Sequence, residues 1–123
     1  MSRAVTLALA LMLSGASAAS AQTPSGDRAA GEGAFGDQCG ICHVEAGGGQ
    51  GPSLKGVIGR KAGSAPGFSF TPQLKAYGLP WTPARLDAFL ANPSQAVPGT
   101  AMPIRIPDPQ ARADLIAYLA SNP

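Results

Sequence analysis

Both cysteines of this 123-residue chain and its single histidine fall within five consecutive positions, in the stretch CGICH at residues 39–43. Thiolates and imidazoles are among the side chains that bind transition metals most readily. A chain that places Cys39, Cys42 and His43 side by side therefore points to metal or covalent cofactor chemistry at this stretch.

Three other interpretations of the two cysteines fit the pattern less well. A disulfide between residues three apart would close a very small loop and constrain the chain little. A thioredoxin-like dithiol belongs at the start of a helix in a βαβ unit, and no strand pattern surrounds these residues. Zinc would find three ligands here, and no second cluster in the sequence supplies a fourth.

The spacing C-x-x-C-H is the signature of covalent haem attachment. Side chains at positions i and i+3 lie on one face of a helical turn, so both thiols can reach one edge of a porphyrin. The histidine, one residue later, can present its imidazole to the iron. We predict one covalent haem c, attached through Cys39 and Cys42, with His43 as an iron ligand.

A second iron ligand has to come from elsewhere in the chain, which has no other histidine but has three methionines. Met1 and Met12 lie in an N-terminal segment that we expect to be removed, which leaves Met102. A methionine that merely fills a core would belong to an apolar helical stripe. Met102 instead lies in VPGTAMP, where Pro98 and Pro103 prevent a continuous helix. We predict its thioether as the sixth ligand.

The first residues have the pattern of an export signal. Arg3 precedes an apolar run at residues 5–13, and small residues follow, with A-x-A cleavage sites at residues 16–18 and 19–21. An uncleaved anchor is the alternative, but the apolar run is too short to span a bilayer. We expect residues 1–21 to be a cleaved signal peptide, residues 22–123 to form a single domain, and the mature protein to be periplasmic in a bacterium.

Composition narrows the function classes further. Charged residues make up 13% of the chain and the formal net charge is +2, so the chain lacks the basic patch typical of nucleic-acid binding. Sixteen glycines and twelve prolines favour short helices joined by loops. A small core of this kind gains stability from a bound cofactor.

The pattern of capping residues predicts an all-α fold. A first helix is expected over residues 27–38, with Asp27 as its N-cap. Three later helices should start where a capping residue precedes a proline, at residues 71–72, 82–83 and 108–109. We expect the first of these three to end near Gly78 and the second to end before Pro93. No alternating pattern predicts a strand.

Taken together, these stretches resemble class I c-type cytochromes of the mitochondrial and bacterial soluble type. The resemblance runs from about Gly31 to Leu119 and covers CGICH, GPSLKGVIGRKAGSAPGFSF, LANPS, PGTAM and DLIAYL. It implies a cytochrome c fold of short helices and loops around one haem, so that residues 22–123 form one cytochrome c domain. It also implies that His43 and Met102 are axial ligands, and that the protein transfers electrons and is not an enzyme.

The resemblance extends to residues around the haem. It implies that the carbonyl of Pro52 accepts a hydrogen bond from His43, and that Arg60 and Trp81 donate hydrogen bonds to haem propionates. It places Thr100 near the haem edge and the methionine loop. Gly31 matches the small residue where the first and last helices cross.

The sequence also departs from the family pattern. Phe70, Leu74 and Phe89 stand where relatives usually have polar side chains, which implies a more apolar haem pocket. Low polarity raises the reduction potential, whereas lost hydrogen-bond donors lower it. Mitochondrial relatives surround the exposed haem edge with lysines, and the matching positions here are uncharged, namely Gln38, Ser94, Gln95 and Ala101.

These features predict a diffusible, monomeric one-electron carrier. Its expected partners are redox proteins, such as a periplasmic dehydrogenase and a membrane oxidase or reductase, without nucleic acid and without stable membrane insertion. One alternative is a haem-bearing subunit of a periplasmic oxidoreductase. Another is a small haem enzyme or gas-binding protein, which would need an open iron face and a distal acid or base.

Overall fold

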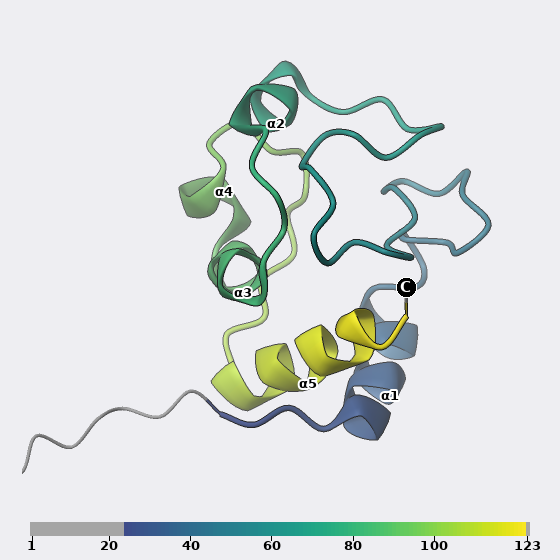
Figure 1. Ribbon diagram of the computed structural model, residues 1–123, viewed down its shortest axis with the longest axis vertical. Coiled ribbons are helices and arrows are strands. Elements are labelled where there is room, and N and C mark those ends of the chain that lie inside the picture. Colours follow the sequence, from purple (N-terminus) through teal and green to yellow (C-terminus); the bar gives the residue numbers. More distant parts are fainter. Residues whose placement is uncertain (1–23, 123) are drawn as a thin grey trace, which may run out of the picture.

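Five helices are present in the computed structural model, which describes residues 24–122, and the loops that join them range from Asn92 alone to the long stretch of residues 39–71 (Figure 1). The helices are α1 (Arg28–Gln38), α2 (Pro72–Tyr77), α3 (Pro83–Ala91), α4 (Pro93–Ala96) and α5 (Pro109–Ala120). Within the described range, β-type pairing is limited to an isolated bridge between Lys61 and Pro80. The predicted all-α fold is confirmed. The proposed signal peptide, with Met1, Met12 and both cleavage sites, lies outside the described residues.

The helices begin where the capping pattern predicts. The side chain of Asp27 accepts a hydrogen bond from the Ala30 amide at 3.0 Å, at the start of α1. Thr71, Thr82 and Asp108 cap α2, α3 and α5 in the same way, and a proline follows each of them. In each case the side-chain oxygen satisfies an amide that has no partner within the helix.

Helix α3 ends before Pro93, as predicted, but the short helix α4 that follows it was not predicted. The structure shows a new helix starting at this proline, with the Asn92 side chain accepting a hydrogen bond from the Gln95 amide at 3.3 Å. Asn92 followed by Pro93 is the same cap-and-proline pattern that marks the other helices. The signal was therefore present in the sequence.

Helices α1 and α5 cross at one end of the molecule (Figure 1), and Gly31 makes the crossing possible. A Cβ atom at Gly31 would overlap the carbonyl oxygen of Asp114 and would lie 2.9 Å from the Cβ of Tyr118. Next to this contact, the rings of Phe35 and Tyr118 pack with their centroids 5.2 Å apart. The glycine predicted at the crossing is thus at the point of closest approach.

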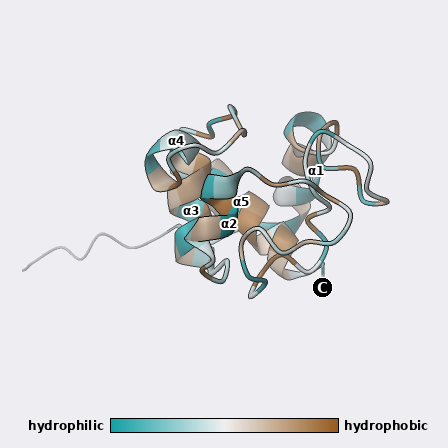
Figure 2. Cartoon of the chain, turned by 90° about the horizontal axis from the view of Figure 1, so that it is seen from above, coloured by the Kyte–Doolittle hydropathy of each residue, from teal (hydrophilic) through white to brown (hydrophobic). Residues whose placement is uncertain are grey.

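The buried hydrophobic residues come mainly from α3, α5 and the loops beside them. Leu86, Phe89 and Leu90 are the buried residues of α3, and Leu115 and Leu119 are those of α5. Figure 2 shows hydrophobic residues of the chain gathered in the middle of the molecule, around α3 and α5. None of the helices in the described range is long and apolar enough to cross a membrane.

A hydrogen-bond network around Asp114 ties α5 to the start of α1. Its Oδ1 accepts hydrogen bonds from the Asp27 amide at 2.7 Å and from the Gln110 side chain at 2.9 Å. These two donors, the Asp27 amide first, lower the pKa of the Asp114 carboxyl. The folded protein therefore stabilises the charged carboxylate of Asp114 more than the unfolded chain does. This contribution to folding stability is present above the ordinary pKa of an Asp carboxyl, and it is lost as the pH falls and the native carboxylate becomes protonated.

We expect Asp114→Asn to reduce stability at neutral pH, because the charged acceptor is lost. The deficit relative to the unmodified protein should shrink as the pH falls from about 5 towards about 2, since the native carboxylate becomes protonated over that range. Thermal melting of the haem-loaded protein across this pH range measures the difference.

Glu32→Gln is the matched control for this prediction. The Glu32 carboxylate makes a 3.8 Å contact with Arg28 on an exposed helix surface, where ion pairs contribute little. This variant should leave the pH dependence of melting nearly unchanged. A constant deficit for Asp114→Asn at every pH would show that the carboxylate charge has no part in the contact.

Candidate haem-binding site

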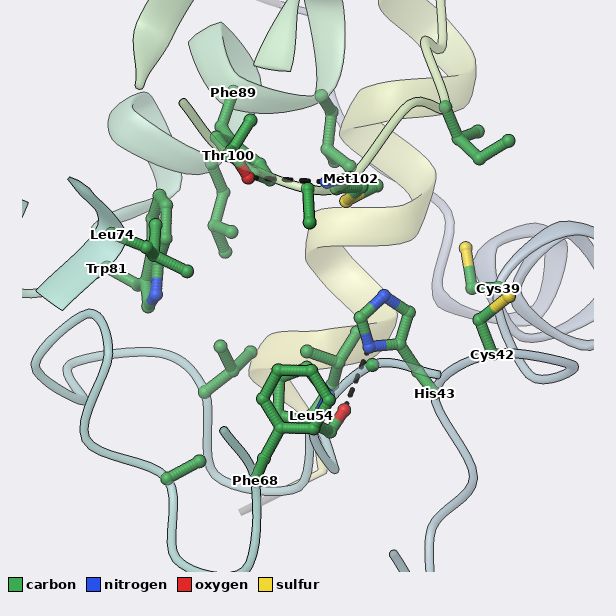
Figure 3. A pocket seen from close by; sticks show the side chains of 18 of the residues that line it. Cys39, Cys42, His43, Leu54, Phe68, Leu74, Trp81, Phe89, Thr100 and Met102 are labelled. Atoms are coloured by element: carbon green, nitrogen blue, oxygen red, sulfur yellow. Dashed lines mark hydrogen bonds between the residues drawn. The ribbon is translucent and has the colours of Figure 1, made fainter. Parts of the chain in front are cut away.

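A cavity of about 220 Å³ lies between α3, α5 and the loops of residues 39–71 and 100–106. Its walls are mostly apolar, and Figure 3 shows the side chains that surround it. The apolar lining includes Phe35, Leu54, Val57, Phe68, Leu86, Leu90 and Leu115. An apolar cavity with a few polar groups is the usual form of a cofactor site.

Cys39 and Cys42 lie together at one edge of this cavity (Figure 3). The chain makes a helical turn here, because the amide of Cys42 donates to the Cys39 carbonyl at 3.1 Å and the amide of His43 donates to the same oxygen at 2.8 Å. Both cysteines are free thiols. The turn therefore gives the two sulfur atoms the shared orientation that thioether bonds to one porphyrin edge require.

Burial raises the pKa of the Cys39 thiol, and the neighbouring Cys42 raises it further. Thiol–disulfide chemistry depends on the thiolate form and is favoured where the pKa is lowered. This environment therefore gives no support to the alternative of a redox dithiol.

The ring of His43 enters the cavity from the wall next to the cysteines (Figure 3). Its Nδ1 lies 2.8 Å from the carbonyl oxygen of Pro52. A carbonyl oxygen can only accept, so Nδ1 carries the proton and Nε2 keeps its lone pair. The contact with Pro52 thus leaves Nε2 as the nitrogen that can bind a metal.

Gly51 fixes the position of the same ring from behind. A Cβ atom at this residue would lie 2.5 Å from Cε1 and 2.6 Å from Nδ1 of His43. Any side chain there would push the imidazole out of place. No spacing or motif in the sequence identifies Gly51 as a contact of this ring, although it directly precedes Pro52 in the stretch GPSL.

Met102 lies on the wall of the cavity opposite His43, and both side chains point into the space between them (Figure 3). Its amide donates to the hydroxyl of Thr100 at 3.4 Å, and the Thr100 amide donates to the Val97 carbonyl at 3.0 Å. Gly99, with φ of +90°, allows this turn, and a Cβ atom there would overlap the Gln73 side chain of α2. A thioether and an imidazole thus face each other across an apolar space.

Arg60 and Trp81 both line the cavity. The Arg60 guanidinium donates to the carbonyls of Ser53 at 2.9 Å and Lys55 at 3.0 Å, and burial lowers its pKa. A guanidinium has five N–H groups, so donors remain for a further acceptor. Trp81 is 8% exposed and packs edge-on against Phe89, with ring centroids 5.0 Å apart.

The positions where the sequence departs from the family pattern divide into those that line the cavity and those that do not. Phe70, Leu74 and Phe89 all line the cavity, as do Gln38 and Ala101 at its edge. Ser94 and Gln95 belong to α4 and are not among the residues that line it. The uncharged positions expected around the cofactor edge are therefore only partly brought together.

The residues present fit a covalently bound haem. The walls are apolar, two free thiols share one face of a turn at the edge, and an imidazole and a thioether enter from opposite sides. When bound, such a group supplies one-electron chemistry at its iron.

Comparison with known proteins decides the family. The sequence model of the family named cytochrome c matches residues 28–123. The chain belongs to the cytochrome c family. It is 46% identical to cytochrome c2 of Rhodomicrobium vannielii over 102 residues, which cover 80% of this chain and 81% of that protein.

Two further relatives support the assignment of this chain to the cytochrome c family. Cytochrome c of Tetrahymena pyriformis is 46% identical over 100 residues, which cover 80% of this chain and 91% of that protein. The solved structure of cytochrome cH from Methylobacterium extorquens superposes with a TM-score of 0.74 at 49% identity, covering 78% of this chain and 99% of that chain. The cytochrome is accordingly a haem-bearing electron carrier with one covalent haem c, and the predicted class I c-type assignment is confirmed.

We expect Gly51→Ala to displace the His43 ring in this cytochrome. The new methyl group cannot fit at 2.5 Å from the ring, and overpacking of this kind costs about 1–3 kcal/mol. The yield of haem-loaded protein should fall, and the visible spectrum and reduction potential of the remainder should change.

Gly33→Ala is the control, because a Cβ atom at this position in α1 would meet nothing within 4 Å. Replacing a helical glycine by alanine should stabilise the protein by about 0.5–1 kcal/mol and leave the spectrum unchanged. Identical spectra and potentials for the two variants would show that Gly51 does not position the imidazole.

Proposed function

We propose that this chain is a soluble periplasmic one-electron carrier. In this proposal Cys39 and Cys42 attach the haem, and His43 and Met102 bind its iron from opposite sides. The observation that carries the proposal is the placement of an imidazole and a thioether on facing walls of one apolar cavity, with two free thiols at its edge. The periplasmic location is supported by the export signal at residues 1–21.

Two protein ligands suit electron transfer better than catalysis. His43 is held by the Pro52 carbonyl at 2.8 Å, and the turn at Thr100 holds Met102. A fully ligated metal offers no position to a substrate, and fixed ligands keep the same geometry in both oxidation states. The apolar walls exclude water, so little solvent has to reorganise when the charge changes.

Further residues surround the haem in this proposal. The Pro52 carbonyl makes the imidazole a stronger donor by hydrogen-bonding its other nitrogen. The unused N–H groups of Arg60 and the indole N–H of Trp81 are donors for the propionates, which need partners where they are buried. Thr100 supports the loop of Met102 through its hydroxyl.

Electron exchange takes place at the cavity edge near the cysteines. Ile41, between the two cysteines, is 79% exposed, and Ile104, which lines the cavity beside Met102, is 44% exposed. Gln38 and Ala101, also at the cavity lining, carry no charge. An edge of this composition favours contact with a redox protein through apolar side chains over long-range attraction between charges.

We expect Met102→Ala to keep the covalent haem, to lower the reduction potential and to open the iron to added ligands. The thioether stabilises the reduced state, so its loss favours the oxidised one. Redox titration and the far-red absorption band of methionine-ligated ferric haem measure the change. Survival of that band in the variant would mean that another group is the ligand.

The unmodified protein should resist carbon monoxide at neutral pH, because both axial positions are taken. Rapid binding by the reduced protein would instead favour a gas-binding protein or a haem enzyme. The native mass of the purified protein tests the expectation of a monomer, and co-purification with a larger oxidoreductase would favour the role of a bound subunit.

The rate of electron transfer should depend only weakly on salt. Oxidation of the reduced protein by bacterial membranes that contain a terminal oxidase should change by less than about twofold between low and physiological ionic strength, because Gln38 and Ala101 at the cavity edge carry no charge to steer the encounter. A steep fall with added salt would contradict this expectation. Gln38→Lys adds a cation at the cavity edge and should steepen the dependence, whereas Gln95→Lys on α4 should have less effect.

A further inference from the structure

The segment that carries Met102 has few hydrogen bonds of its own. Pro98, Pro103 and Pro107 have no amide hydrogen. Between residues 98 and 107, the main-chain amides that reach main-chain acceptors are those of Thr100, which donates to Val97, and Ile106, which donates to Leu90 of α3 at 2.8 Å. The shape of this segment therefore depends on what holds its two ends.

Arg112, in the first half of α5, holds the second of these ends. Its Nη1 donates to the carbonyls of Ile106 and Pro107, both at 2.9 Å. Its Nε donates to Oδ1 of Asp87 on α3 at 2.7 Å, and the Arg112 side chain is 12% exposed. One guanidinium thus joins α3, α5 and the end of the methionine segment.

We infer that Arg112 and Asp87 are positioning residues for Met102. They fix the chain four residues beyond the methionine, and they set how closely the thioether is held to its place opposite His43. The inference rests on the proposed ligation of the iron by Met102.

The chemistry of the two side chains explains this role. A guanidinium offers N–H groups on several nitrogens in a fixed plane, so Arg112 serves the carboxylate from Nε and the two carbonyls from Nη1, whereas an ammonium carries its three N–H groups on a single nitrogen. Asp87 compensates the charge of a guanidinium that is largely withdrawn from water. Charge-assisted hydrogen bonds are stronger than neutral ones, so they hold the loop end more firmly than the main-chain bonds alone.

Loss of Arg112 leaves the carbonyls of Ile106 and Pro107 without their side-chain donor. The segment then opens more often, and the position opposite His43 becomes available to an external ligand. The apparent affinity of such a ligand rises in proportion to the open population.

The test measures imidazole binding to the oxidised, haem-loaded protein, together with thermal unfolding followed by circular dichroism. For Arg112→Gln we expect imidazole affinity to rise about tenfold, as the loss of a hydrogen bond to a charged group implies. The far-red methionine band should disappear on heating at a temperature where the helices are still folded. Asp87→Asn keeps an oxygen acceptor without the charge and should give a smaller rise, and Arg112→Lys should not restore the unmodified affinity.

Arg28→Gln is the matched control. Arg28 also has an ion pair, 3.8 Å from Glu32, and a side-chain hydrogen bond to Ser121 at 2.8 Å, but it links α1 to α5 away from Met102. This variant should lower the melting temperature and leave imidazole affinity within about twofold of the unmodified protein.

Unchanged imidazole affinity in Arg112→Gln, or equal changes in Arg112→Gln and Arg28→Gln, would overturn the inference, since the pair would then contribute only to general stability. If Arg112→Gln yields no haem-loaded protein, the imidazole affinity of Asp87→Asn is compared with that of the unmodified protein and of Arg28→Gln instead. An unchanged affinity in Asp87→Asn would then overturn the inference. Absence of the far-red band from the unmodified protein would instead reject Met102 as the ligand, and the inference with it.

Discussion

The hydrogen bond between His43 and the Pro52 carbonyl is the contact on which the site depends. At 2.8 Å it assigns the proton to Nδ1 and leaves Nε2 as a donor to a metal. Gly51 acts in the same direction, since the absence of a side chain lets the backbone pack directly behind the ring. The orientation of a single imidazole is thus determined by two consecutive residues of a loop that has no regular secondary structure.

The rest of the fold builds a space around that imidazole. Helices α3 and α5 supply apolar side chains, and the loops of residues 39–71 close the opposite side (Figure 1). Much of the hydrophobic surface faces the cavity, so the core is completed by the haem that members of this family carry. Cofactor binding and folding therefore stabilise each other.

The two ligand walls differ in how they are held. The wall of His43 follows directly on α1 through the turn of residues 39–43. The wall of Met102 is a proline-rich segment held at its ends by Thr100 and by the contacts of Ile106 and Pro107 with α3 and α5. Rigidity at the thioether is consequently a property of the packed helices as well as of the loop.

Local chemistry in the sequence determined the haem signature, the candidate ligand Met102 and the starts of four helices, because C-x-x-C-H spacing and capping residues act over a few positions. The end of α3 before Pro93 was also predicted correctly, but the start of α4 at Asn92 and Pro93 carried the same capping signal and was missed. The tertiary structure alone decided which atoms meet outside these local patterns. The contact of Gly51 with the His43 ring depends on how an irregular loop folds back on itself, and the attachment of Asp87 and Arg112 to the methionine segment depends on how α3 packs against α5. No periodicity or spacing in the chain encodes such contacts.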